Sequence, residues 1–190
     1  MSAFFLGLDP GFASLGWATF LYSEDLSRLL DVNAGVIRTK KSHKKLRVAA
    51  SSDDHRRGRE IARALHGRCA LRPLAIAAEA MSFPRNAGSA YKVGRAWGVV
   101  DCLAMIFDVP VFEATPQNLK VKVAGSASAS KDEVEWGVDE AVDMLGLPGS
   151  MKAALAAVPA SLRNHAYDAG GAILATLERP EVRMLVRRVG

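Results

Sequence analysis

The stretch FFLGLDPGFASLGWATF, residues 4–20, decides the fold of this chain, because it holds two apolar runs separated by a turn. Residues 4–8 predict a buried strand, and residues 15–22 predict a second strand that returns beside it as a hairpin. Asp9 is the only charged residue of the stretch. An aspartate that leaves a buried strand is costly unless something binds it, although Asp-Pro-Gly is also good turn chemistry. The sequence therefore raises the question of what Asp9 binds.

The composition is that of one globular domain over residues 1–190. Hydrophobic residues make up 49% and charged residues 24% of the chain, which excludes a disordered protein. The net charge of +5 and the pI of about 9.4 favour an anionic partner. No apolar run approaches the length of a membrane span, and the first residues lack the basic start of a secretory signal. We therefore expect a cytoplasmic protein, with Cys69 and Cys102 as reduced, buried thiols.

The remaining apolar runs predict a mixed α/β sheet covered by helices. Further strands are expected at residues 29–37, 74–78 and 109–113. Helical spacing of apolar residues predicts helices at 58–68, 87–107 and 164–177, and Ser130 with Glu133 forms the capping box of another. The residues after Glu178, about 179–190, are expected to be a loose tail.

Acidic residues at the ends of these elements point to a metal site. Asp9, Glu79 and Glu113 each end a strand, and Asp168 follows His165 by one helical turn. Carboxylate oxygens bind Mg²⁺, and two such ions about 4 Å apart can clamp the attacking and leaving oxygens of a phosphodiester. Each residue has an ordinary alternative, as a turn residue, an exposed strand end or a local pair. Several together in a basic protein favour the metal site.

Two further segments carry positive charge. Residues 38–59 include TKKSHKKLR and HRRGR, and a solvated loop and a phosphate-contacting surface are equally good interpretations. The small residues SASAS, 126–130, separate Lys120 from Lys131. Taken alone, both lysines are ordinary surface residues.

Four motifs in order resemble the RuvC-type Holliday-junction resolvases of the ribonuclease H-like superfamily: LGLDPGFASLGWATF, AIAAEAMSFPRNAGSAYKVGRAWGVV, ATPQNLKVKVAGSASASKDEV and NHAYDAGGAILA. The resemblance implies a mixed five-stranded sheet flanked by helices. It also implies a magnesium-dependent endonuclease that resolves four-way DNA junctions by paired symmetric nicks. The family works as a homodimer, with the helix at 87–107 matching its interface. Two Mg²⁺ ions per site are expected, and Mn²⁺ is expected to substitute for them.

The resemblance also assigns roles to individual residues. It implies that Asp9, Glu79, His165 and Asp168 hold the metals, and that Lys131 neutralises charge at the scissile phosphate. An aromatic wedge follows the glutamate in the family; Ser82 aligns with it directly, and Phe83 lies one residue later. The residues expected to contact DNA are Lys120, Lys131, Phe83, Arg85, Lys40, Lys41, Lys44 and Lys45.

Three other functions fit parts of the pattern. Another nuclease of the same fold would act on an RNA–DNA hybrid or a flap, and a non-catalytic protein would only bind junctions. A sugar kinase or actin-like ATPase needs a longer chain and a second glycine-rich phosphate loop, which the sequence lacks. Residues 38–59 and 139–163 differ from the cellular resolvases, which indicates a phage or mobile-element member.

Overall fold

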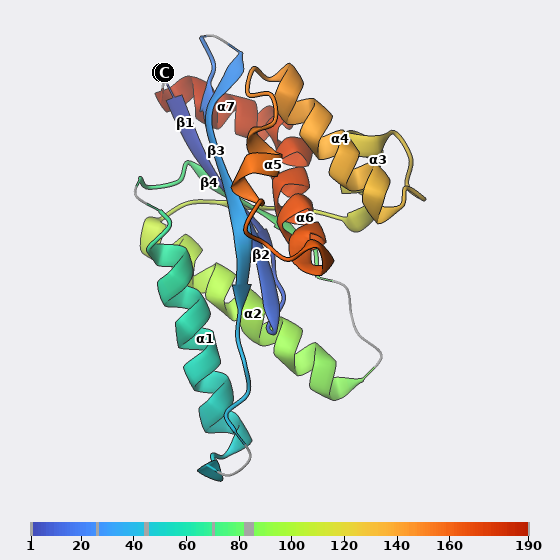
Figure 1. Cartoon of the computed structure of the whole chain (residues 1–190). Helices are drawn as coiled ribbons and strands as arrows, with labels where there is room; N and C mark the ends of the chain where they lie inside the picture. The colour runs from blue at the N-terminus through green and yellow to red at the C-terminus, as the bar shows by residue number, and fades with distance from the viewer. Residues whose placement is uncertain (1, 26, 44–45, 70, 82–85, 190) are drawn as a thin grey trace.

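A five-stranded mixed sheet forms the centre of the protein in a computed structural model, which describes residues 2–25, 27–43, 46–69, 71–81 and 86–189 (Figure 1). The strand order is β3-β2-β1-β4-β5. The first three strands are antiparallel neighbours, whereas β4 runs parallel to β1 and β5 parallel to β4. The strands are β1 (Ser2–Asp9), β2 (Ser14–Ser23), β3 (Arg28–Arg38), β4 (Ala75–Glu79) and β5 (Val111–Ala114). The predicted mixed sheet and its opening hairpin are confirmed.

Helices cover both faces of the sheet, as Figure 1 shows. One face carries α1 (Ala50–His66) and α2 (Ala87–Phe107). No described helix is long and apolar enough to cross a membrane. The other face carries α3 (Pro116–Ala124), α4 (Lys131–Met144), α5 (Ser150–Ala154), α6 (Ala160–Leu177) and α7 (Pro180–Val189).

The alternation of side chains along β1 builds a separate core on each face. Leu6 and Leu8 point into the core beneath α1 and α2, and Phe5 points into the core beneath α6. Both cores are apolar and closely packed, so the sheet is covered on both sides in the way that parallel strands require. This explains why residues 4–8 form a continuous apolar run.

Two glycines allow α6 to lie directly on the sheet. A β-carbon on Gly7 of β1 would overlap the carbonyl oxygen of Ala169, and one on Gly16 of β2 would overlap the carbonyl oxygen of His165. The backbone of α6 therefore rests on the backbone of the hairpin, with no side chain between them. This close contact brings the middle of α6 to the end of β1.

Helices α3 and α5 have no predicted counterpart, α6 begins four residues before its predicted start, and two other helices differ more strongly from the sequence-based expectations. Helix α1 begins at Ala50, eight residues before the predicted start, because its first turns bury Asp53 and Arg57 in place of apolar residues. The residues after Glu178 are not a loose tail, because they form α7, which buries Val182 and Val186 against the core beneath α6. Helix α2 has the predicted bounds.

The two cysteines are both free, and they lie in different surroundings. Cys69 is half-buried, and burial raises the pKa of its thiol to about 11. Cys102 is exposed on α2, so the prediction of a buried thiol is wrong there. An apolar face on α2 that is open to solvent accounts for this difference.

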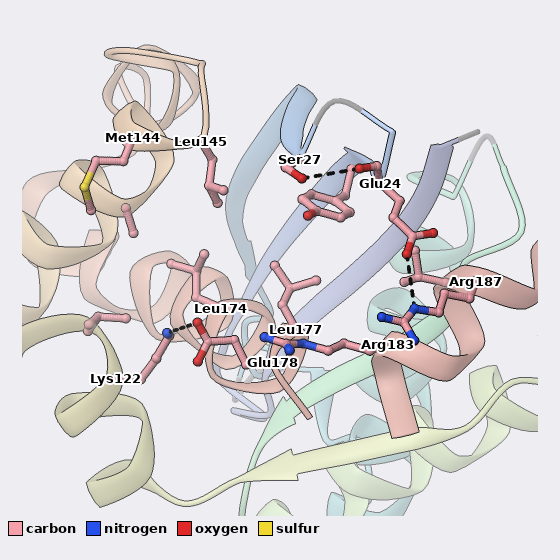
Figure 2. Close-up of a pocket in the computed structure, with 14 residues that line it drawn as sticks. Glu24, Ser27, Lys122, Met144, Leu145, Leu174, Leu177, Glu178, Arg183 and Arg187 are labelled. Atoms are coloured by element: carbon pink, nitrogen blue, oxygen red, sulfur yellow. Dashed lines mark hydrogen bonds and ion pairs between the residues drawn. The ribbon is translucent and has the colours of Figure 1, made fainter. Parts of the chain in front are cut away.

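A cavity of about 460 Å³ lies at the end of the sheet away from Asp9, where α7 meets the β2–β3 turn (Figure 2). Leu174 and Leu177 form part of its apolar wall. An ion pair joins Lys122 to Glu178 at 2.6 Å. None of the residues predicted for the metal site lines this cavity.

Candidate metal and DNA-binding site

Three carboxylates meet at one edge of the sheet. Asp9 ends β1 and Glu79 ends β4, and these neighbouring parallel strands place their carboxyl ends side by side. Asp168 reaches the same place from α6. One oxygen of each carboxylate lies within 4.8 Å of the others, and all three side chains are half-buried. The sequence-based grouping of these three residues is therefore reproduced in space.

Burial, and after it the neighbouring negative charges, disfavour the ionised forms of Glu79 and Asp168. Burial raises the pKa of Glu79 to about 8, and the charges of Asp9 and Asp168 add to this effect. Burial and the charge of Asp9 raise the pKa of Asp168 to about 6. Oxygen donors whose negative charge is disfavoured in the metal-free site suit a hard divalent cation. The positive charge of the cation stabilises the ionised carboxylates and replaces the protons that they would otherwise retain. The donor set thus fits a magnesium-type ion.

His165 lies beside this cluster and contacts one of its members. Its Nδ1 atom lies 2.5 Å from Oδ2 of Asp9, at hydrogen-bonding distance. This hydrogen bond raises the pKa of the imidazole above its usual value. The described group of three possible ligands does not include His165. A direct role of His165 as a metal ligand stays a prediction.

Both predicted lysines flank the carboxylates. Lys120 on α3 and Lys131, the first residue of α4, line a hollow of about 130 Å³ together with Glu79 and Asp168. The Nζ atom of Lys120 donates a hydrogen bond of 2.7 Å to the carbonyl oxygen of Ala129. Ala129 is buried, so the small-residue segment between the lysines is anchored at this point.

Three polar residues of this hollow were missed by the sequence reasoning. Asn164 and Tyr167 come from α6, and Glu135 comes from α4. A helical signal was available for two of them, because Asn164 precedes Asp168 by four positions and Glu135 follows Lys131 by four. Tyr167 donates a hydrogen bond to Asp139 at 3.2 Å, which fixes α6 against α4.

The other predicted residues are more scattered. Glu113 is exposed on the edge strand β5 and does not belong to the described carboxylate cluster. Lys40 and Lys41 are exposed directly after β3. The predicted DNA contacts at Lys44, Lys45, Phe83 and Arg85, with the aligned Ser82, lie outside the described residues.

Helix α2 carries an apolar surface that faces solvent. Tyr91, Met105 and Ile106 expose 50%, 74% and 59% of their surface, and Cys102 lies between them. A β-carbon on Gly98 would meet no atom within 4 Å. This open face coincides with the helix predicted to form a dimer interface.

A family model described as crossover junction endodeoxyribonuclease RuvC matches residues 5–160. The matched region includes Asp9, Glu79 and both lysines of the hollow, and it ends before His165 and Asp168. This match therefore does not bear on His165 or Asp168, and of these two only Asp168 belongs to the described carboxylate cluster.

Curated relatives carry the same description. The crossover junction endodeoxyribonuclease RuvC of Pseudothermotoga lettingae is 33% identical over 143 residues, covering 75% of this chain and 82% of the relative. That of Sodalis glossinidius is 31% identical over 172 residues, covering 88% of this chain and 89% of the relative. The similarity thus extends over most of both chains.

Solved structures show the same architecture. Thermus thermophilus RuvC in complex with Holliday junction substrate superposes with a TM-score of 0.63 at 29% identity, covering 91% of this chain and 92% of that one. Fowlpox virus resolvase, in complex with its substrate Holliday junction DNA, gives a TM-score of 0.53 at 11% identity. The second likeness shows a shared fold alone.

Proposed function

The chain belongs to the RuvC family of crossover junction endodeoxyribonucleases, and from this premise we propose that it resolves four-way DNA junctions by cutting two strands symmetrically. The observation that carries the proposal is the meeting of Asp9, Glu79 and Asp168 at one edge of the sheet, with Lys120 and Lys131 beside them. This arrangement combines oxygen ligands for a cation with positive charge for a phosphate.

The carboxylates are the proposed metal ligands. Asp9, Glu79 and Asp168 hold two Mg²⁺ ions, for which Mn²⁺ can substitute, and His165 completes the ligand set from its position beside Asp9. A pair of Mg²⁺ ions supplies an activated water and stabilises the leaving 3′ oxygen of a phosphodiester. The acidic cluster and the family together support this assignment.

The lysines act on the substrate phosphate. Lys131 is exposed at the mouth of the hollow, where its charge stabilises the negative charge that develops on the scissile phosphate. Lys120 is held by its hydrogen bond to Ala129 and contributes a fixed positive charge next to Glu79. Lys40, Lys41 and the other predicted basic residues contact the phosphates of the DNA backbone, which positions the DNA without reading its bases.

A homodimer supplies two such sites for two strands. We place its interface on the exposed face of α2 that Tyr91, Met105 and Ile106 form, because exposed apolar side chains on one helix gain free energy when they are covered. A two-fold axis through this helix would present both carboxylate clusters to a symmetric junction.

Cleavage mapping tests the proposed function directly. End-labelled four-way junction, flap, linear duplex and RNA–DNA hybrid are incubated with the protein, with and without Mg²⁺. Paired cuts at symmetric positions of the junction, only with metal, are the expected result. Preferred cutting of the hybrid or flap would support another nuclease of this fold, and junction binding without any cleavage would support a binding protein.

A further inference from the structure

A short segment after β3 is tied to the protein and is not a freely solvated loop. We call residues 39–42 the basic strap. Thr39 is buried, and its hydroxyl donates a hydrogen bond of 2.6 Å to the carbonyl oxygen of Phe12. Arg57 of α1 donates from Nε to the same hydroxyl at 2.9 Å. The strap therefore leaves the sheet beside the loop that follows Asp9.

Helix α1 holds the remainder of the strap through a carboxylate. Oδ1 of Asp53 accepts hydrogen bonds from the backbone nitrogen of Ser42 at 3.1 Å and from its hydroxyl at 2.6 Å. Arg56 binds the same oxygen at 2.8 Å and also donates to the carbonyl oxygen of Lys40 at 2.5 Å. Asp53 is 7% exposed, so this acidic residue serves as an internal anchor within a basic surface.

A hollow of about 300 Å³ lies between the strap and α2. Lys41 from the strap, Arg47 beyond it and Lys92 from α2 all line this hollow. None of the three forms an ion pair in the part of the chain that the structure describes. The negative charges of the two acidic residues that line the same hollow are neutralised by arginines. Asp53 pairs with Arg56 at 2.8 Å, and Asp54 pairs with Arg57 at 3.5 Å.

We propose that this hollow binds a backbone phosphate of a junction arm, with Lys41, Arg47 and Lys92 as its contacts and Asp53 as the positioning residue that holds the strap. The proposal rests on the proposed function, since it assumes a branched DNA substrate. Three cations without acidic partners around one hollow match a phosphate group. A strap fixed before binding loses less conformational entropy when the DNA arrives. Removal of the Asp53 charge should therefore weaken DNA binding, although simple electrostatics predicts the opposite.

The first test compares two lysines. Lys92→Ala removes a proposed contact, and Lys122→Ala is its control, because Lys122 lies at the cavity of Figure 2 and pairs with Glu178. Affinity for a four-way junction is measured by fluorescence anisotropy in EDTA over a range of NaCl concentrations. One lost phosphate contact should lower affinity about fivefold near 0.15 M salt and reduce the log–log salt slope by about 0.9. Lys122→Ala should change both less.

The second test compares two acidic residues that both pair with Arg56. Asp53→Asn removes the ion pair with Arg56 and leaves Ser42 a weaker, uncharged acceptor, whereas Glu60→Gln removes a charge on the same helix without touching the strap. Asp53→Asn should bind the junction several-fold more weakly than the parent, and Glu60→Gln should bind equally well or better. Ser42→Ala removes the other half of the anchor without changing charge, so it should weaken binding in the same direction. It also serves as the test if Asp53→Asn does not fold.

The outcomes separate this inference from the proposed function. The phosphate site is overturned if Lys92→Ala and Lys122→Ala bind the junction with the same affinity and salt dependence. It is also overturned if a folded strap variant binds the junction as tightly as Glu60→Gln does. In both cases the proposed function stands as long as the parent protein binds and cleaves junctions. A parent protein that shows no preference for junctions over linear duplex overturns the proposed function itself. Thermal unfolding of each variant shows whether weaker binding follows from the loss of the strap or from loss of the fold.

Discussion

Gly7 of β1 lies so close to Ala169 of α6 that a β-carbon at position 7 would overlap the carbonyl oxygen of Ala169. The distance between helix and sheet is therefore set by backbone atoms, which cannot move aside as a flexible side chain can. Asp168 precedes Ala169 directly, so this contact also fixes how far its carboxylate reaches toward Asp9. The closeness of the helix to the sheet and the geometry of the site thus depend on the same contact.

Gly16→Ala should destabilise the protein and impair cleavage together. The new β-carbon would overlap the carbonyl oxygen of His165 and force α6 away from the sheet. Overpacking of this kind costs about 1–3 kcal/mol. At about 2–4 °C per kcal/mol for a chain of this size, thermal unfolding should show a fall of several degrees. Gly58→Ala on α1 is the control: its β-carbon has room, and it should leave stability unchanged or slightly higher.

Asp9→Asn should abolish metal-dependent cleavage and leave junction binding largely intact. Asparagine keeps the size and turn chemistry of the residue and loses the charge that holds a cation. Cleavage is measured under single-turnover conditions, and binding is measured by anisotropy in EDTA. Normal cleavage by the folded variant would return Asp9 to the role of a turn residue.

Glu79 should make the metal-free protein less stable as the pH rises. The carboxyl pKa is about 8 in the folded protein against an ordinary 4.5, so the folded state binds this proton more tightly than the unfolded state does. Stability from this group is present at low pH and is lost between about pH 4.5 and 8. In EDTA, Glu79→Gln should therefore unfold at a higher temperature than the parent at pH 8.5 and at nearly the same temperature at pH 4.5.

The same protons should oppose metal binding. Mg²⁺ must displace the proton of Glu79, so the affinity of the parent for Mg²⁺ should rise with pH through the range below about 8. Calorimetric titration in buffers of different ionisation enthalpy measures both the affinity and the protons released. An affinity that stays constant from pH 6 to 8.5 would contradict the assignment of Glu79 to the metal.

His165 should make cleavage sensitive to acid. The hydrogen bond with Asp9 raises the imidazole pKa, and a protonated imidazole has no lone pair for a metal. His165→Asp should keep Mg²⁺-dependent cleavage and move the acid limb of the pH profile to lower pH, whereas His165→Ala should lose much more activity. Single-turnover rates at saturating Mg²⁺ are the measurement. If His165→Ala cleaves as fast as the parent at every pH, the site depends on the three carboxylates alone.

Ile106→Asp should convert the proposed homodimer into a monomer. The substitution places a charge on the exposed apolar face of α2, where Ile106 is 59% exposed, so the monomer should still fold. Light scattering after size-exclusion chromatography gives the mass. Met184→Asp on α7 is the matched control, because Met184 is 54% exposed and lies on another helix. A dimer that survives Ile106→Asp and dissociates with Met184→Asp would move the interface to α7.

Much of the sheet could be predicted because its residues follow simple local rules. The apolar runs of β1 and β2 gave the hairpin, and the predicted capping box at Ser130 and Glu133 is present at the start of α4. The four ordered motifs also identified the family, which the comparisons confirm. Asp9, Glu79 and Asp168 could be grouped because each lies at an element boundary or on an otherwise small, apolar helix face.

Other features depend on contacts that local patterns do not encode. The first turns of α1 bury Asp53 and Arg57, and a buried polar network has no apolar periodicity by which to recognise it. Gly7 and Gly16 look like ordinary strand glycines until α6 is placed over them. Helix α7 is strongly charged at its exposed positions, so Val182 and Val186 alone could not distinguish it from a loose tail.

The close packing of α6 against the β1–β2 hairpin has a consequence for the protein during its synthesis. Asp9 is made before Asp168 and before the helix that covers Gly7 and Gly16. Chains are made from the amino terminus, so a nascent or prematurely terminated polypeptide that stops before Ala160 has neither the third carboxylate nor the cover of the sheet. Translation products that stop before Ala160 should therefore be unable to cut DNA, so cleavage becomes possible only after α6 has been made.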